Sequence, residues 1–195
     1  PPPGPILSHL LLLLATVAPA DTAPVRFAAA PTPAPRAARR AMTPVESAMS
    51  RAKAYSADSI LLDKSERRLT MFHRGREVAS YEVALGKNPV GPKVRRGDGR
   101  TPEGLYFIEA RNSASKYHLS LRISYPAPKD RAIAERRGVS PGGDIMIHGL
   151  PTAFSTVGAL HRQQDWTEGC VAVTNDEIEE IWRAVPDGAR ILIRP

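Results

Sequence analysis

The sequence predicts a mainly β domain with flanking helices, built as an antiparallel β-sandwich. Three observations lead to this fold class. Many short segments after residue 58 run apolar or alternate between apolar and polar residues, and turn residues separate them. Few segments carry a helical pattern, and they do not alternate with the strands as βαβ units require. No glycine-rich phosphate-binding loop opens any of the predicted helices.

The first 20 residues have the features of a secretory signal peptide. The apolar run Ile6–Ala18 is too short to span a bilayer, and Ala18-Pro19-Ala20 has the A-x-A form of a signal-peptidase site. We therefore expect residues 1–20 to direct export to the periplasm. Because the segment starts without a Met and without basic residues, we expect that its start is truncated or misassigned. An uncleaved membrane anchor is the alternative.

Residues 21–42 are rich in Ala, Pro and Arg, which cannot bury a core, so we expect a flexible linker there. One folded domain then covers residues 43–195, a length that suits a single core. Its first element is a short helix over residues 43–55, because Thr43 and Glu46 can form a capping box.

Three antiparallel strands follow. They are predicted over Ser59–Leu62, Arg68–Phe72 and Val78–Leu85, because these segments alternate or run apolar. The turns between them fall at Asp63-Lys64 and at Arg74-Gly75, which are residue types that favour tight turns.

A long loop over residues 86–104 is rich in Gly, Pro and basic residues, and a loop of this length is either functional or disordered. It leads into a strand over Leu105–Ile108. Another strand is predicted within residues 117–126, where alternation gives one apolar face that joins the core. The other face of this strand carries a polar row that either lines a cleft or faces solvent: His118, Ser120, Arg122 and Ser124.

The C-terminal third contains two apolar strands and two helices. A short helix is expected over residues 128–137, and apolar strands are expected over Ile145–Ile147 and Val171–Val173. A capping box at Thr174 opens an amphipathic helix, and Arg190–Ile193 forms the last strand. The apolar stripe of the helix, with Trp182 as a core anchor, consists of Ile178, Ile181, Trp182 and Val185.

Two strand ends carry the candidate catalytic pair. Cys170 is the single cysteine of the chain, and His148 directly follows the apolar strand 145–147. Because a protonated thiol is a weak nucleophile, a catalytic cysteine needs a base within reach, and His148 is the best placed imidazole. Gly169 has no side chain to block a substrate carbonyl, so backbone N–H groups near Gly169 and Cys170 could stabilise an oxyanion.

Other interpretations of these residues remain open. A lone cysteine is often a small buried apolar residue, and a lone histidine is often a hydrogen-bonded structural group. A zinc site is a further alternative, although its spacing matches no compact zinc motif. Its four candidate ligands are His148, His161, Asp165 and Cys170. A papain-like hydrolase is disfavoured because the histidine precedes the cysteine here.

The same region resembles a known family. A strand ending in I-H-G and a later T-x-G-C-x-x-x-x-N run resemble the signature of the YkuD-type L,D-transpeptidases. His148 falls on the histidine of that signature. Thr167, Gly169, Cys170 and Asn175 fall on its Ser/Thr, Gly, Cys and Asn. The resemblance therefore implies that Cys170 is the nucleophile and His148 the base.

Two positions depart from the family pattern. Glu168 stands where the family often has a second histidine, and Ala172 stands where it often has an arginine that contacts a substrate carboxylate. With Trp166 before the threonine, both departures resemble the subgroup that includes the murein lipoprotein-releasing amidase. The resemblance implies substrate contacts from Trp166, Thr167, Glu168 and, on the polar row, His118.

The resemblance implies a YkuD-like β-sandwich over about residues 59–195 and cysteine-dependent acyl transfer on peptidoglycan stem peptides, with no metal and no organic cofactor. Cys170 would attack a meso-diaminopimelate carbonyl, and an acceptor amine or water would resolve the thioester. L,D-transpeptidation is the first expectation. Release of a lysine-linked, wall-anchored lipoprotein by hydrolysis is the second, and an inactive wall-binding module is the third.

The charge balance agrees with a polymeric partner outside the cytoplasm. The net charge of +7 suits an anionic partner such as cell-wall polymer, although ordinary solubility explains it equally well. No segment interleaves basic and aromatic residues, so nucleic acid is not an expected partner. The single cysteine cannot form an internal disulfide, and a free thiol in an exported protein indicates reactivity. We expect the protein to be a monomer.

Overall fold

The computed structural model describes residues 56–195. The predicted signal peptide (1–20), linker (21–42) and first helix (43–55) lie outside the described residues. Within residues 56–195, no helix has the length and apolarity needed to cross a bilayer.

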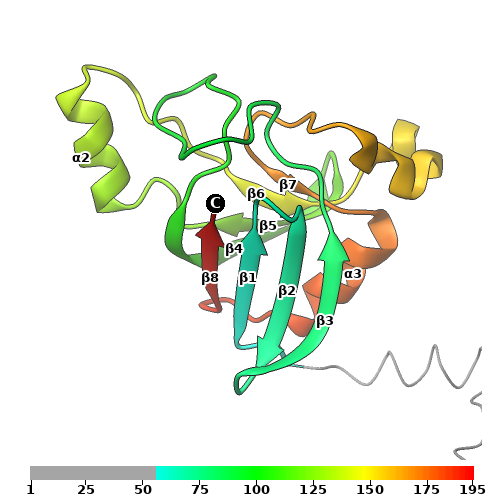
Figure 1. The fold of residues 1–195 in the computed structure, drawn as a ribbon. Coiled ribbons are helices and arrows are strands. Elements are labelled where there is room, and N and C mark those ends of the chain that lie inside the picture. Colours follow the sequence, from blue (N-terminus) through cyan, green and yellow to red (C-terminus); the bar gives the residue numbers. More distant parts are fainter. Residues whose placement is uncertain (1–55) are drawn as a thin grey trace, which may run out of the picture. The chain divides into compact units, whose positions relative to one another are not determined.

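The domain begins with three strands in an antiparallel meander, as predicted (Figure 1). β1 covers Ser59–Asp63, β2 covers Arg68–His73 and β3 covers Arg76–Glu82. The turn between β2 and β3 consists of Arg74 and Gly75, whose φ values of 50° and 74° suit a tight hairpin. β1 and β2 are in full register from Ser59 opposite Phe72 onward.

The meander joins the rest of the fold through the C-terminal strand. β8 (Arg190–Arg194) pairs in parallel with β1 and antiparallel with β4 (Gly104–Ser115). β4 is longer than the predicted strand: its first part pairs with β8 and the rest, after Phe107, pairs with β5 (His118–Ile123). The eight-stranded sheet, in the order β3-β2-β1-β8-β4-β5-β6-β7, therefore curls at β4.

Two short strands complete the sheet. β6 (Met146–His148) pairs antiparallel with β5, and β7 (Val171–Ala172) pairs in parallel with β6. The mainly β fold class with a few helices is confirmed, but two of its strand pairings, β1–β8 and β6–β7, are parallel rather than antiparallel. Both join strands that are far apart in sequence, so no local pattern signals them.

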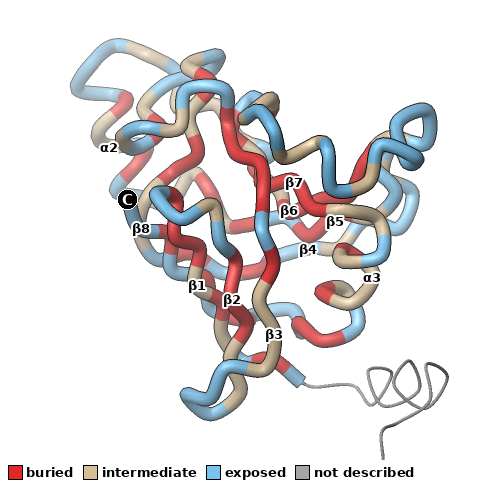
Figure 2. Tube along the Cα trace, turned by 45° about the vertical axis from the view of Figure 1, so that its right-hand side comes forward, coloured by how far each residue is buried: buried red, intermediate tan, exposed pale blue. Residues whose placement is uncertain are grey.

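The two halves of the sheet share one core, and Figure 2 shows its buried residues in red along the strands. Leu69 and Ile191 come from one half, and Leu121, Ile147 and Val171 come from the other; all five are at most 1% exposed. Burial of this apolar surface is the main stabilising contribution to the fold.

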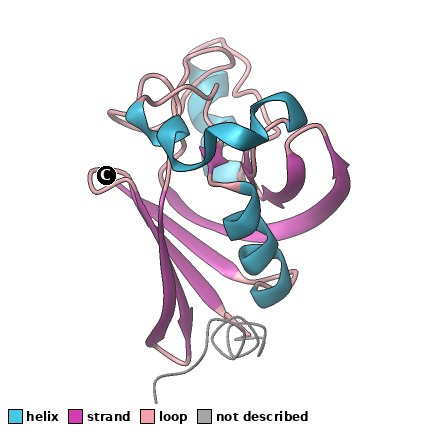
Figure 3. Cartoon of the chain, turned by 90° about the vertical axis from the view of Figure 1, so that its right-hand side faces the viewer, coloured by secondary structure: helices cyan, strands magenta, loops and turns pink. Residues whose placement is uncertain are grey.

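Two α-helices and a 3-10 helix flank the sheet (Figure 3). α2 covers Pro128–Arg136, and α3 covers Asn175–Ala184 with the predicted capping box at Thr174. The predicted core role of Trp182 on α3 is confirmed, because its side chain packs partly buried against the core. The polar segment Leu160–Asp165 is partly helical, because residues 160–163 belong to the 3-10 helix η1 (Thr152–Gln163), which has a kink at Gly158.

Candidate active site

The sheet register places Cys170 and His148 on one face of the sheet. Between β6 and β7, Ile147 lies opposite Val171, and His148 lies opposite Ala172. Ile147 and Val171 are buried in the core. Because side chains alternate along a strand, His148 and Cys170, their neighbours in sequence, point to the opposite face. The candidate base and nucleophile therefore stand on adjacent strands and on the same side of the sheet.

The polar row of β5 shares this face. Ser120 lies opposite His148, and Arg122 lies opposite Met146. Ser120 is buried beside His148, and Arg122 is exposed further along the same face. The register thus places two residues of the polar row on the face that carries His148 and Cys170.

His148 is held in one orientation. Its side chain is buried, and Nδ1 lies 2.7 Å from the carbonyl oxygen of Gly149. A carbonyl oxygen can only accept, so Nδ1 carries the proton in this bond and Nε2 of the neutral ring has a free lone pair. Burial lowers the pKa of His148 below its ordinary value, although the bond to Gly149 acts in the opposite direction. The ring is therefore neutral near pH 7 and able to accept a proton.

The half-buried thiol of Cys170 is also in its neutral form. Burial raises the pKa of Cys170, and the Met146 amide and the Lys93 ammonium oppose this shift. The Sγ atom donates to the carbonyl oxygen of Asp144 at 3.5 Å. Within residues 56–195, Cys170 and His148 are not hydrogen-bonded to each other. Catalytic hydrogen bonds are often long or poorly aligned in the absence of substrate, so the lack of a bond between these two side chains is compatible with a catalytic pair.

Aromatic side chains surround the His148 ring. Tyr117 stacks on it with ring centroids 4.3 Å apart, and Trp166 lies edge-on at 5.8 Å. Trp166 also donates from Nε1 to Nδ1 of His161 at 3.5 Å, at the upper limit for such a bond. Beyond these rings lies an apolar pocket of about 390 Å³, lined by Tyr117, Leu150, Pro151, Phe154, Val157, His161 and Trp166.

The backbone before the nucleophile is fixed by Thr167. Its hydroxyl donates to the carbonyl oxygen of Cys170 at 2.7 Å and accepts from the N–H of Gly169 at 3.1 Å. The Gly169 N–H is therefore already engaged and would have to leave Thr167 to reach an oxyanion. Gly169 has φ 131°, and a Cβ atom there would lie 2.4 Å from the carbonyl oxygen of Arg100. Only glycine fits this close approach of the two backbone segments.

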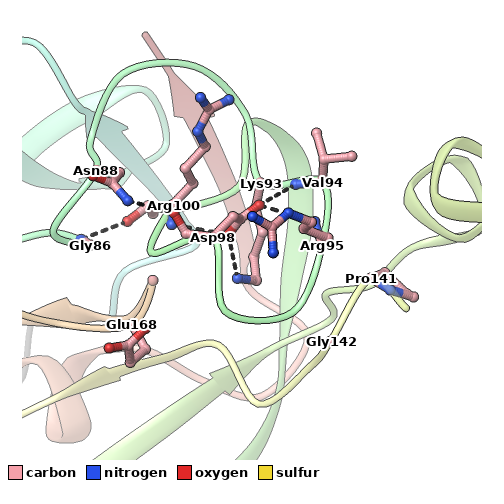
Figure 4. Close-up of polar contacts among 12 residues, drawn as sticks. Gly86, Asn88, Lys93, Val94, Arg95, Asp98, Arg100, Pro141, Gly142 and Glu168 are labelled. Atoms are coloured by element: carbon pink, nitrogen blue, oxygen red, sulfur yellow. Dashed lines mark hydrogen bonds and ion pairs between the residues drawn. The ribbon is translucent and has the colours of Figure 1, made fainter. Parts of the chain in front are cut away.

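The long loop after Leu85 is ordered and packs on this backbone. Within it, the Asp98 carboxylate accepts from Nζ of Lys93 at 2.8 Å, and the two side chains are only 9% and 3% exposed. As Figure 4 shows, the same carboxylate gathers the loop around itself by accepting from the backbone N–H groups of Val94, Arg95 and Arg100. The loop thereby holds Arg100 against Gly169.

Two of the predicted substrate contacts are engaged elsewhere. Glu168 forms an exposed ion pair with Lys87 at 2.5 Å, and His118 contacts Glu179 on α3 at 2.9 Å. Their assignment to substrate stays a prediction. Tyr117, the neighbour of His118, is the residue that reaches His148.

The side chains of the zinc alternative do not form a metal site. Within the part of the chain that the structure describes, no three His, Cys, Asp or Glu side chains are arranged to hold a metal ion. Asp165 instead accepts from the backbone N–H of Leu85 and forms an ion pair with Arg67.

Sequence reasoning missed three residues of the site: Tyr117, Lys93 and Asp144. Tyr117 belonged to the predicted strand, but its position before the polar row gave no sign of stacking on His148. Lys93 lies in a loop that contains several other basic residues, so nothing in the sequence distinguished it from them. Asp144 contributes a backbone carbonyl, which every residue has, so side-chain chemistry could not have revealed it.

The chain is similar to known proteins of one family. A family model described as YkuD, L,D-transpeptidase catalytic domain, matches residues 57–193. The chain is 31% identical over 143 residues to YafK of Escherichia coli (strain K12), which bears the name of an L,D-transpeptidase. This match covers 70% of the chain and 50% of YafK. The chain thus spans about half the length of this relative.

Solved structures share the fold. Bd1075 of Bdellovibrio bacteriovorus aligns with a TM-score of 0.52 at 28% identity, covering 72% of this chain and 48% of Bd1075. Pgp2, a helical cell shape determining protein of Campylobacter jejuni, aligns with a TM-score of 0.54 at 21% identity, covering 75% and 53%. The match over residues 57–193 and the relation to YafK establish that the chain belongs to the YkuD family of L,D-transpeptidase catalytic domains.

Proposed function

We propose that the protein is an L,D-transpeptidase that transfers the acyl group of a peptidoglycan stem peptide through a thioester on Cys170, with His148 as general base. The observation that carries this proposal is the common face of Cys170 and His148 on adjacent strands, with Nδ1 of His148 bound to Gly149. That bond leaves Nε2 to exchange a proton with the thiol. The protein acts in the periplasm, where its substrate lies.

The first step forms the thioester. Cys170 Sγ attacks the carbonyl carbon of meso-diaminopimelate as its proton passes to His148 Nε2, and an oxyanion forms. Backbone N–H groups beside Cys170 stabilise that charge, and removing one such donor typically costs about 3 kcal/mol of the barrier. The C–N bond then breaks, His148 returns the proton to the leaving amine, and the acyl group stays on sulfur.

The second step reverses these movements with another nucleophile. An acceptor amine gives its proton to His148 Nε2 and attacks the thioester carbonyl, and the Cys170 thiolate leaves and regains the proton. The new amide joins two stems. Because the same nitrogen serves both amines, leaving and entering groups occupy the side of the cleft near His148.

The apolar pocket favours a second candidate, an amidase that releases a lysine-linked lipoprotein from diaminopimelate. Its walls, Tyr117 and Trp166, contact the His148 ring, so it lies on the amine side of the site. A volume of about 390 Å³ far exceeds the methyl group of a D-alanine leaving group and suits an apolar side chain of a polypeptide. In this reaction water, not an amine, resolves the thioester.

Mass analysis of muropeptides after incubation with the purified protein tests the proposal. With tetrapeptide stems as donor and acceptor, crosslinked dimers and free D-alanine should appear. With peptidoglycan bearing lysine-linked protein and no acceptor stems, a transferase should release protein slowly. Rapid multiple-turnover release with a free diaminopimelate carboxylate would instead establish the amidase. No product from either substrate would reject both.

A further inference from the structure

A cluster of exposed charged side chains lies on the sheet face that carries Cys170, at the same level along the strands. Arg122 on β5 lies opposite Met146 on β6, and Met146 stands at the level of Cys170 because Ile147 lies opposite Val171. Neighbouring strands are about 4.8 Å apart, so the backbones at Arg122 and Cys170 are separated by about 10 Å on one face. A long side chain from Arg122 can cover much of that distance.

Two carboxylates flank the Arg122 guanidinium. Glu109 accepts from Nε at 2.9 Å, and Asp144 lies 3.5 Å from Nη2. The backbone carbonyl oxygen of Asp144 also accepts the hydrogen bond from the Cys170 thiol, so this cluster lies next to the nucleophile. All three charged side chains are 42% exposed or more and are accessible to a ligand.

We propose that Arg122 and Asp144 bind the zwitterionic amino-acid group at the end of the diaminopimelate side chain. This inference rests on the proposed function and names the group by which that site selects its acyl donor. Once one carboxyl of diaminopimelate is the reacting acyl group, the other end carries an ammonium and a free carboxylate. Arg122 receives the carboxylate, and Asp144 receives the ammonium.

Charge and reach both fit this ligand. A guanidinium pairs with a carboxylate through two parallel hydrogen bonds, and Glu109 holds Arg122 by Nε, which leaves its two terminal nitrogens for such a pair. The contact between Arg122 and Asp144 is long enough for a ligand to separate the two groups. The diaminopimelate side chain spans about four bonds, roughly 5–6 Å, which is close to one strand spacing.

The cluster contributes little to folding, so its presence beside the nucleophile calls for another explanation. Exposed ion pairs contribute little to protein stability. The cluster places a cation on the sheet face that carries Cys170, although Ala172 stands where the family often has an arginine for a substrate carboxylate. Arg122 reaches the same cleft from a different strand.

Binding to the full chain carrying Cys170→Ala tests the inference without turnover. Three tetrapeptide donors are compared that differ only in the third residue: meso-diaminopimelate, its form with the side-chain carboxyl amidated, and lysine. Loss of a bidentate charged pair should weaken binding about tenfold to a hundredfold, so the first donor should bind most tightly by that factor. Adding Arg122→Gln should remove the difference.

Arg183→Gln is the matched control, because Arg183 forms an equally long exposed ion pair of 3.5 Å with Glu179 on α3. It should retain the full preference for meso-diaminopimelate. Equal binding of the three donors, or an equal loss of preference in Arg183→Gln, would overturn the inference. Turnover by the wild-type protein is measured separately. Product formation without donor preference would reject the proposed binding by Arg122 and Asp144 alone. Measured preference without product would reject the proposed function alone.

Discussion

At Cys170 and His148, burial shifts two pKa values in opposite directions and leaves both groups neutral. The resting site is therefore a thiol and an imidazole rather than an ion pair, and in the proposed mechanism the proton moves when the substrate carbonyl arrives. A neutral thiol in the resting protein is also less prone to oxidation than a thiolate.

His148→Ala should lower the rate of acyl transfer by about a hundredfold or more, because a general base is lost. His161→Ala should cost far less, since Nδ1 of His161 contacts only Trp166. The acid limb of kcat/KM should lie below pH 6.5, because burial lowers the pKa of His148 and the base must be neutral to act. Stopped assays across pH on both variants measure these effects, and the reverse ranking would reassign the base.

Gly169→Ala should abolish turnover and destabilise the fold. The new Cβ would lie 2.4 Å from Arg100 O, and φ is 131°. Gly75→Ala is a matched control that keeps the left-handed φ of 74° without any atom within 4 Å, so it should cost only about 1–2 kcal/mol and no activity. Thermal unfolding and turnover of both variants decide the matter, and equal effects would mean that the close approach to Arg100 is unimportant.

Residue identities and spacing singled out the candidate pair Cys170 and His148 but not its surroundings. Cys170 and His148 could be named because their chemistry is rare and both stand at strand ends. Tyr117 precedes β5, where the pairing between β4 and β5 is irregular from Asn112 to Ser115 and where His118 has φ 69°. These irregularities change the direction of the chain at the start of β5 and so help to set the contact of Tyr117 with His148. Backbone irregularities of this kind have no signal in residue type alone.

At the scale of elements, the loop after β3 supports the nucleophile through Asp98. Asp98→Ala should cost about 3 kcal/mol or more, because it leaves the buried Lys93 ammonium unpaired and frees three backbone N–H groups. Turnover should fall with it, because Arg100 is no longer held against Gly169. Chemical denaturation and activity assays measure both effects.

Asp187→Ala is the control for that loss, since the pair of Asp187 with Arg111 is exposed at the carboxylate. Its cost should stay within about 1 kcal/mol. If Asp98→Ala were as mild as this control, the loop would not depend on its buried ion pair.

Elements with a local pattern were predicted well, and those held by distant partners were not. α3 has both a capping box and an apolar stripe, so sequence located it closely. β4 runs on to Ser115 through residues without apolar alternation, because pairing with β5 satisfies its backbone. η1 has no buried residue, so no apolar stripe in the sequence indicated it.

At the scale of the whole molecule, acidification should destabilise the fold in a defined window. Burial lowers the pKa of His148 and, mainly by the same cause, that of His161 to about 4. As pH falls from about 6.5 towards 4, the unfolded chain binds more protons than the folded one, so the free energy of unfolding falls. Below about pH 4 Asp98 adds to the loss, because its hydrogen bonds outweigh burial and hold its pKa at about 2.

Replacing His161 by Gln should reduce this loss between about pH 7 and pH 4.5 by on the order of 1 kcal/mol, because one of the two groups no longer titrates. Urea unfolding at the two pH values measures the difference. An unchanged pH dependence in His161→Gln would show that this ring is not protonated more easily in the unfolded chain.

The overall architecture followed from its parts only in outline. A mainly β domain could be inferred from strand patterns, whereas the parallel pairing of β1 with β8 joins strands about 130 residues apart and is fixed by the shared core. The same long-range pairing, through β6 and β7, sets Cys170 beside His148. The candidate active site thus depends on the complete sheet.

Intact-mass spectrometry of the protein during turnover tests the central claim most directly. Mixed with a tetrapeptide donor and no acceptor, the wild-type chain should gain the mass of the acyl group, carried on the peptide containing Cys170 and removed by hydroxylamine as a thioester. Cys170→Ala should fold normally, gain no mass and form no product. An adduct or undiminished turnover in Cys170→Ala would contradict the account.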